Sequence, residues 1–149
     1  MNTADTKTVV EALETLLADT YTLYLKTHSY HWNVKGPMFT TLHTMFETQY
    51  TELALAVDEI AERIRALGSP APGSYTQFMR RASVKEDVTV PKATDMIANL
   101  VADAAVVVAS ARKLVRAAEE LGDDASTDLG VRRIELHEKN AWMLRSHLE

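Results

Sequence analysis

Helical periodicity runs through almost the whole of this chain. Apolar residues recur at spacings of three, four and seven over long stretches, as they do in a helix that buries one face. Nowhere do apolar and polar residues alternate as in a half-buried strand. We therefore expect an all-α protein. The pattern predicts four long helices, over residues 6–34, 39–67, 91–121 and from Asp124 or Ser126 to Leu148.

Glycine and proline mark the helix ends. Gly36-Pro37 follows the first helix and Gly122 follows the third, where a left-handed cap or a helix break is needed. Pro91 suits the first turn of the third helix. The apolar stripe of the fourth helix runs through Val131, Ile134, Trp142 and Leu148. The methionines interpreted as core filler are Met38, Met45, Met79, Met96 and Met143.

Connection lengths predict the topology. The first and second helices are joined tightly, as are the third and fourth, so each pair should be antiparallel neighbours. The linker from Gly68 to Pro91 is long for a bundle and has room for a short helix near Tyr75 to Arg81. Such a linker allows a crossover between the two hairpins. The expected fold is a ferritin-like four-helix bundle with a short helix in the central crossover linker.

Length and composition are those of a compact globular protein. The 149 residues fit one domain, which we take as 1–149, and 46% are apolar and 25% charged. Because cysteine is absent, disulfide bonds and thiolate metal sites are excluded. We expect no signal peptide and no stretch apolar enough, for long enough, to span a bilayer. The expectation is a cytoplasmic protein without a membrane partner.

The charge balance bears on possible partners. The formal net charge is −5 at pH 7, whereas proteins that bind nucleic acid through their surface are usually basic. Residues 1–8 contain only Lys7 as a cation, balanced by Asp5, and Leu148-Glu149 carries no basic extension. DNA binding is therefore doubtful. An acidic surface attracts cations, which mildly favours a metal-handling role.

Candidate metal ligands gather on the second helix and at the end of the first. His43 and Glu47 are four residues apart, as are Asp58 and Glu62, so each pair shares one helix face. His31 lies five residues before the turn glycine and His43 seven after it, so an antiparallel hairpin can set both rings at one level. Imidazole and carboxylate without thiolate suit iron, manganese or zinc, and several carboxylates favour redox-active iron.

These ligands form two groups that one chain cannot bring to a single metal ion. Glu47 and Asp58 are roughly 16 Å apart along a helix that rises about 1.5 Å per residue, whereas metal–ligand bonds are about 2 Å long. A two-fold dimer with antiparallel second helices would set the histidine group of one chain against the carboxylate group of the other, twice. We therefore expect a homo-oligomer with metal sites between subunits.

Several candidates also have simpler interpretations. His31 can be a hydrogen-bonded core histidine, and for His28 we prefer that interpretation. The carboxylate pair can be a solvated face that forms a charge network with Arg63 and Arg65. Trp32 can serve packing or act as an electron donor near a site.

Two further observations concern the last turn and the type of site. Asp123, Asp124 and Asp128 cluster there, and helix capping or a cation entry path explains them equally well. No Glu-x-x-His occurs in the chain, which argues against a di-iron bundle whose ligands all come from one subunit.

Three segments in combination resemble the Dps family, the DNA-protecting mini-ferritins of starved bacteria. The resemblance covers essentially the whole chain, including Ala141-Trp142 near its end. The segments are His31-Trp32-Asn33-Val34-Lys35-Gly36-Pro37, Leu42-His43 and Asp58-Glu59-Ile60-Ala61-Glu62-Arg63.

The resemblance implies a hollow dodecamer that oxidises iron(II) at dimer interfaces, preferably with hydrogen peroxide, and stores the ferric mineral inside. Asp123 and Asp128 fall in the region that lines the family's acidic pores. The family's ligand positions, with the bridging carboxylate last, fall on His31, His43, Asp58, Glu62 and Glu47. Many members have aspartate at this last position, so Glu47 supplies the same carboxylate group on a longer side chain.

Three functions follow from these features. The first is a ferroxidase and iron store that uses iron and hydrogen peroxide as substrates. The alternative is a nucleoid or DNA-binding protein with incidental metal sites. The third is a structural helical oligomer that binds no metal. Iron(II) titration and a DNA gel shift distinguish them.

Overall fold

The computed structural model describes residues 3–149. Among these residues there is no strand. The expected all-α bundle is confirmed, including a short helix at residues 75–81. The helices are α1 (Thr3–Asn33), α2 (Phe39–Ala66), α3 (Tyr75–Arg81), α4 (Ala93–Leu121) and α5 (Asp124–Arg145), followed by a 3-10 turn, η1 (Ser146–Leu148).

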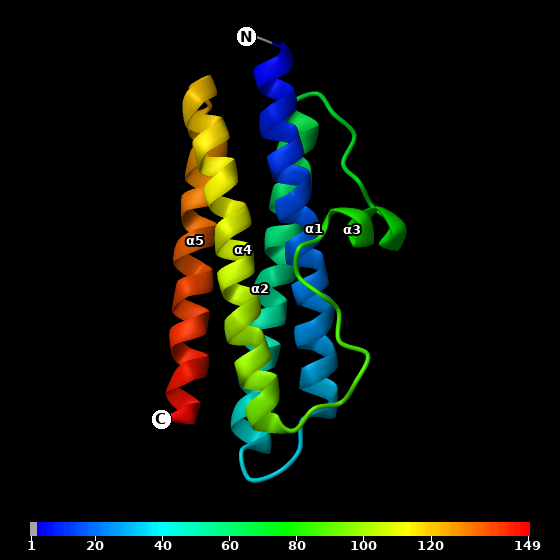
Figure 1. The fold of residues 1–149 in the computed structure, drawn as a ribbon, viewed down its shortest axis with the longest axis vertical. Helices are drawn as coiled ribbons and strands as arrows, with labels where there is room; N and C mark the ends of the chain where they lie inside the picture. The colour runs from blue at the N-terminus through cyan, green and yellow to red at the C-terminus, as the bar shows by residue number, and fades with distance from the viewer. Residues whose placement is uncertain (1–2) are drawn as a thin grey trace.

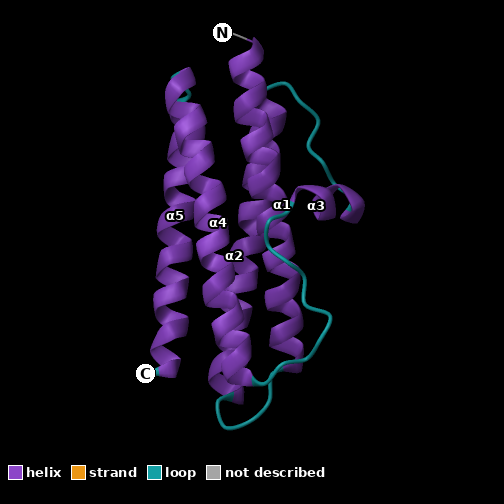
Figure 2. Cartoon of the chain, in the orientation of Figure 1, coloured by secondary structure: helices purple, strands orange, loops and turns teal. Residues whose placement is uncertain are grey.

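The two helical hairpins are connected by a crossover. Figure 1 shows α1 beside α2 and α4 beside α5, each pair antiparallel. The linker between α2 and α4 runs down the length of the bundle, and it carries α3 against α1 (Figure 2). As a result α2 and α4 point the same way. The crossover predicted from the linker length is confirmed.

Two helix starts differ from the sequence-based ones, and α5 ends at Arg145, before the predicted end at Leu148. α1 begins at Thr3, three residues before the predicted start, so the segment considered as a possible DNA-binding tail is helical from there on. Met1 and Asn2 lie outside the described residues. α4 begins at Ala93 rather than Pro91, because Lys92 is still extended, with φ −71° and ψ 162°.

All four long helices contribute to one hydrophobic core. Fully burying a leucine, isoleucine or phenylalanine side chain stabilises a fold by about 1.5–3 kcal/mol, so this core holds the hairpins together. Its largest side chains include Leu13, Leu17, Leu42, Phe46, Ile60, Ile64, Met96, Ile97 and Leu114.

Some residues expected to be buried are exposed. Met79 is exposed because α3 turns Phe78, and not Met79, towards the bundle. Val131, Trp142 and Leu148 are exposed as well. α5 packs mainly against α4, so only one face of α5 is covered.

Hydrogen bonds from α1 hold the crossover in place. The buried carboxylate of Asp19 accepts the backbone N–H groups of Ser83 and Val84, at 2.6 and 3.0 Å, and the hydroxyl of Ser110 at 2.5 Å. Lys26 donates to the carbonyl of Lys85 at 2.8 Å. A buried charge is tolerated only when it is bonded in this way, so Asp19 fixes the path of the linker.

One helix in residues 3–149, α4, is long and apolar enough to cross a membrane by length and composition alone. The expectation that no stretch has this property is therefore wrong. In the bundle α4 packs against α1 and α5, and its apolar residues contribute to the core. A helix at the centre of a globular core has the same composition.

Candidate metal centre

Two histidine rings stack on each other where α1 and α2 meet. His31 lies in the last turn of α1 and His43 in the second turn of α2. The hairpin between them turns at Gly36, whose φ of +105° is a left-handed conformation that suits glycine. The ring centroids are 3.8 Å apart and the planes differ by 14°. The sequence-based expectation that the two rings share one level is confirmed.

Each ring is fixed by the backbone of the other residue. Nδ1 of His31 lies 2.7 Å from the carbonyl oxygen of His43, and Nδ1 of His43 lies 2.8 Å from the carbonyl oxygen of His31. A carbonyl only accepts, so Nδ1 carries the hydrogen in both rings. In the neutral ring Nε2 is then left with its lone pair. A second hydrogen bond that sets the tautomer and ring orientation is typical of metal-ligating histidines.

Glu47 adds a carboxylate to this pair. It follows His43 by one turn of α2, and one carboxylate oxygen lies 3.9 Å from Nε2 of His31. The side chain of Glu47 is 59% exposed, whereas that of His31 is 8% exposed. The carboxylate is therefore free to move towards a cation held by the two rings. We call His31, His43 and Glu47 the histidine half-site.

The second group of candidates lies about three to four turns beyond Glu47 along α2. Asp58 and Glu62 are exposed, and within the described residues neither makes a hydrogen bond or ion pair. Arg63 instead donates to Asp123 at 2.8 Å, and Arg65 to the carbonyl of Ser69 at 3.2 Å. The simpler interpretation of a charge network with these arginines is therefore wrong. We call Asp58 and Glu62 the carboxylate half-site.

The two half-sites do not meet within one chain. Among residues 3–149 no three histidine or acidic side chains come close enough together to hold a metal ion. A complete site built from these five residues would thus need ligands from a second chain.

Aromatic residues surround the histidine half-site. The sequence-based interpretation of His28 was a hydrogen-bonded core residue. In the structure its ring stacks on that of Tyr50, with ring centroids 4.2 Å apart, and contacts the ring of Trp32, with centroids 4.1 Å apart. Burial, and then the neighbouring His31, lower the pKa of His28. Trp32 is 60% exposed, so it is not a core residue. Tyr50 lies 5.1 Å from the ring of His31 and was not singled out from the sequence, although it follows His43 by seven residues on the same face of α2.

The acidic residues at the last turn have different roles. Asp123 is buried, and its carboxylate accepts the backbone N–H of Ser126 at 3.0 Å as the N-cap of α5. Burial alone would raise the pKa of Asp123, but the bonds from Ser126 and Arg63 outweigh it and lower the pKa. Asp128 is exposed and pairs with Arg132 at 2.9 Å. Helix capping therefore explains Asp123, and its place in a pore stays a prediction.

Comparison with known proteins agrees with this architecture. The family model of the ferritin-like domain matches residues 10–149, so the chain is a ferritin-like protein. A low temperature-induced protein of Nostoc, itself uncharacterised, is 43% identical over 143 residues, which are 95% of this chain and 80% of that protein. A DNA protection during starvation protein of Brevibacillus brevis is 35% identical over 150 residues, covering both chains completely. The chain belongs to the Dps family.

Solved structures give the same result. The crystal structure of a Dps protein from Vibrio cholerae O1 superposes with a TM-score of 0.95 at 32% identity, covering 100% of this chain and 94% of that one. That protein is described as a member of a broad superfamily of ferritin-like diiron-carboxylate proteins. The resemblance found in the sequence is thus confirmed, as is the ferritin-like fold. The five candidate ligands remain predictions.

Proposed function

We propose that this Dps-family mini-ferritin is a ferroxidase that oxidises iron(II) with hydrogen peroxide. It stores the ferric product inside a hollow cytoplasmic oligomer, and it protects the cell because it consumes iron(II) and peroxide together. The observation that carries the proposal is the stacked pair of His31 and His43, whose Nδ1 atoms are bonded to backbone carbonyls so that both Nε2 atoms are left to bind a cation.

The proposed iron site lies between two chains. His31, His43 and Glu47 come from one chain, and Asp58 and Glu62 come from a two-fold related copy. Imidazole and carboxylate ligands bind both iron(II) and iron(III), and the carboxylates offset the charge gained on oxidation. Since all five residues lie on α1 and α2, which pack into one hairpin, the ligands are held on rigid elements.

Exposed apolar residues beside the carboxylate half-site support an interface there. Leu55 is 71% exposed, and it lies three residues before Asp58 and seven before Glu62, on the same face of α2. Trp32, next to the histidine half-site, is also exposed. Large apolar side chains on the surface typically mark contact sites when they are grouped. We propose that a second copy covers them, and that such dimers build the dodecamer.

An iron oxidation assay tests the proposal. Iron(II) is added anaerobically to the assembled protein, and the ferric product is then followed optically after adding either peroxide or oxygen. We expect saturable iron(II) binding and faster oxidation with peroxide. The variant His31→Ala with His43→Ala should lose both. A protein that binds no iron(II), or that oxidises it no faster than buffer does, would contradict the proposal.

A further inference from the structure

A series of tyrosine rings leads away from the histidine half-site. Between ring centroids, Tyr50 lies 5.1 Å from His31, Tyr24 lies 6.0 Å from Tyr50, and Tyr21 lies 5.7 Å from Tyr24. Tyr75 on α3 then lies 6.4 Å from Tyr21. We call these four residues, Tyr50, Tyr24, Tyr21 and Tyr75, the aromatic track.

The track contains the ring type that can pass on electrons. A phenol can lose one electron and one proton to become a phenoxyl radical, whereas phenylalanine and imidazole rings are much harder to oxidise. Four of the five tyrosines of the chain are in the track. The fifth, Tyr30, is held apart: its hydroxyl donates to Asp87 at 2.5 Å and accepts from Asn99 at 3.1 Å, and its ring contacts Phe46.

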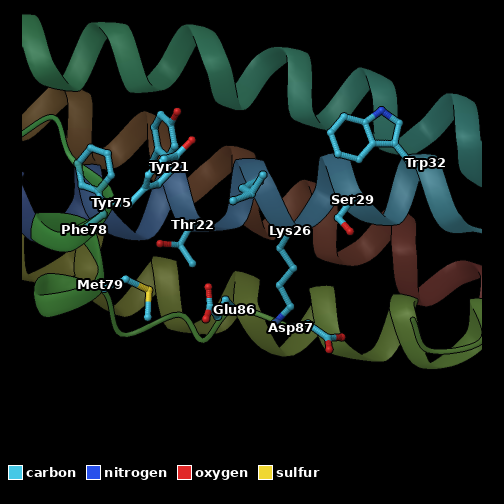
Figure 3. Close-up of a pocket in the computed structure, with 11 residues that line it drawn as sticks. Tyr21, Thr22, Lys26, Ser29, Trp32, Tyr75, Phe78, Met79, Glu86 and Asp87 are labelled. Atoms are coloured by element: carbon cyan, nitrogen blue, oxygen red, sulfur yellow. The ribbon is translucent and has the colours of Figure 1, made fainter. Parts of the chain in front are cut away.

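The far end of the track lies at the level of the turns of α2 that carry the carboxylate half-site. Tyr21 and Tyr75 line a cavity of about 440 Å³ together with Val57 and Ala61. Each of these two α2 residues immediately precedes a member of that half-site in the sequence. Figure 3 shows Tyr21 and Tyr75 close together, with Trp32 at the opposite end of the same stretch of α1. The track therefore spans from one half-site to the level of the other.

The tyrosines of the track differ in exposure. Tyr75 is 71% exposed, and Tyr21, Tyr24 and Tyr50 are half-buried. Burial, and then the neighbouring hydroxyls of Tyr75 and Tyr24, raise the pKa of Tyr21, so its hydroxyl keeps its proton at neutral pH. Tyr21 in the middle of the track thus starts as a phenol that can lose its proton together with an electron.

We propose that the aromatic track carries single electrons from the carboxylate half-site to the histidine half-site during peroxide reduction. The proposal rests on the proposed ferroxidase function. In a two-fold dimer the two half-sites of one chain belong to different iron sites, so the track joins the two sites. It lets one peroxide oxidise two iron(II) ions that are bound at separate sites.

The electron balance shows why a track is useful. Peroxide needs two electrons and two protons to become two waters. When a site holds one iron(II), that ion supplies one electron, and Tyr50 supplies the other electron and one proton, the second proton coming from solvent. The phenoxyl radical on Tyr50 then regains an electron and a proton in turn through Tyr24 and Tyr21. The radical reaches Tyr75, where iron(II) at the second site gives the last electron and solvent the last proton.

Removing one hydroxyl in the middle of the track tests the inference. Tyr24→Phe keeps the ring and its packing but removes the phenol, and Tyr30→Phe makes the same change outside the track. Each protein is loaded anaerobically with one iron(II) per chain and mixed with peroxide. Rapid-freeze electron paramagnetic resonance then follows the radical, and spin-trap adducts are mapped by mass spectrometry.

In the wild-type protein and in Tyr30→Phe we expect adducts at Tyr75 and two iron(II) oxidised per peroxide. In Tyr24→Phe the radical should persist longer, adducts should move to Tyr50 and Trp32, and the iron oxidised per peroxide should fall towards one. Unchanged adducts and radical lifetime in Tyr24→Phe, or iron oxidation without any tyrosyl radical, would overturn the inference alone. No peroxide-driven iron oxidation in the wild-type protein would overturn the proposed function and the inference with it.

Discussion

At the scale of single residues, two buried polar side chains of α5, His137 and Arg133, contact each other. His137 is completely buried, and burial and then the charge of Arg133 lower its pKa to about 3. Arg133 is also buried and donates to both carboxylate oxygens of Glu52. Its guanidinium lies 3.3 Å from Nε2 of His137, and an arginine only donates, so this nitrogen is the acceptor and the ring is neutral.

We expect His137 to make stability depend on pH. In the unfolded chain its pKa is about 6.5, so below that pH the unfolded state binds a proton that the folded state does not. The stabilising effect of the neutral ring is complete above the unfolded pKa and is lost as pH falls towards the folded pKa of about 3. The free energy of unfolding should fall by about 1.4 kcal/mol per pH unit in this window.

Denaturant unfolding at fixed protein concentration, repeated between about pH 7 and about pH 5, measures this slope. His137→Gln should show a smaller slope, and the control variant His147→Gln, at a half-buried position in η1, should keep that of the wild-type protein. Equal slopes in all three proteins would contradict the prediction.

Asp123 carries a second prediction at this scale. Asp123→Ala removes the N-cap of α5 and leaves Arg63 without its ion pair. We expect a loss of about 1–3 kcal/mol in the free energy of unfolding. Asp128→Ala removes only an exposed pair with Arg132 and should cost about 0.5 kcal/mol or less. If the two variants were equally stable by denaturant unfolding, capping by Asp123 would not matter.

At the scale of helices, α4 and α5 approach each other closely at Gly130. A Cβ atom there would lie 2.8 Å from Cγ2 of Val115 and 3.3 Å from the carbonyl oxygen of Ala111. The backbone oxygen cannot rotate away, so the two helices would have to separate. Glycine inside a helix costs about 1 kcal/mol relative to alanine, and the close contact is the reason that this glycine is tolerated.

We therefore expect Gly130→Ala to destabilise the protein by about 1–3 kcal/mol through overpacking, in spite of the better helix propensity of alanine. Gly73→Ala is the matched control, because nothing lies within 4 Å of its Cβ position and its φ is not in the left-handed region. That variant should be neutral or slightly more stable in thermal and denaturant unfolding. A stabilised Gly130→Ala variant would show that the α4–α5 contact is not tight.

The helices themselves could be predicted from the sequence because their periodicity is strong and glycine or proline stands at the ends. The 75–81 helix and the crossover followed from the length of one linker. The path of that linker could not be predicted, since it depends on the bonds of Asp19 to residues more than sixty positions away. Likewise, periodicity alone did not show that only one face of α5 is covered by the other helices and that Trp142 lies on an exposed face.

The candidate site was predictable to a similar extent. Spacing around Gly36 was enough to place His31 and His43 together, because a tight hairpin fixes the register of its two helices. The bonds from each ring to the opposite backbone could not be foreseen, since they depend on ring rotation. Nor could spacing distinguish Asp123 as a helix cap from Asp123 as a pore residue, because both uses need an acidic residue at that turn.

At the scale of the whole molecule, charge leads to a prediction about DNA. With a net charge of −5 and only Lys7 as a cation before Thr8, we expect weak or no retardation of linear duplex DNA at physiological salt and neutral pH. A gel shift series over salt concentration measures this. Strong retardation would contradict it, and the loss of that retardation in Arg112→Ala with Arg116→Ala would then point to the exposed basic face of α4.

The last prediction concerns the sharing of sites between subunits. His31→Ala with His43→Ala removes the histidine half-site, and Asp58→Ala with Glu62→Ala removes the carboxylate half-site. In either variant alone, every site of a two-fold dimer lacks the ligands from one side. Fast peroxide-driven iron oxidation should therefore be lost in both. In Asp58→Ala with Glu62→Ala, folding, followed by circular dichroism, should stay intact, because neither side chain makes a hydrogen bond or ion pair within residues 3–149.

Co-expression of the two variants should partly restore activity. A mixed dimer combines the two damaged half-sites at one position and the two intact half-sites at the other, so it contains one complete site. A site built within a single chain cannot recover in this way, because every chain in the mixture carries a lesion. Mass spectrometry of the intact assembly shows whether mixed dimers have formed. If confirmed mixed assemblies oxidise iron(II) no faster than either parent variant, the site is not shared between subunits.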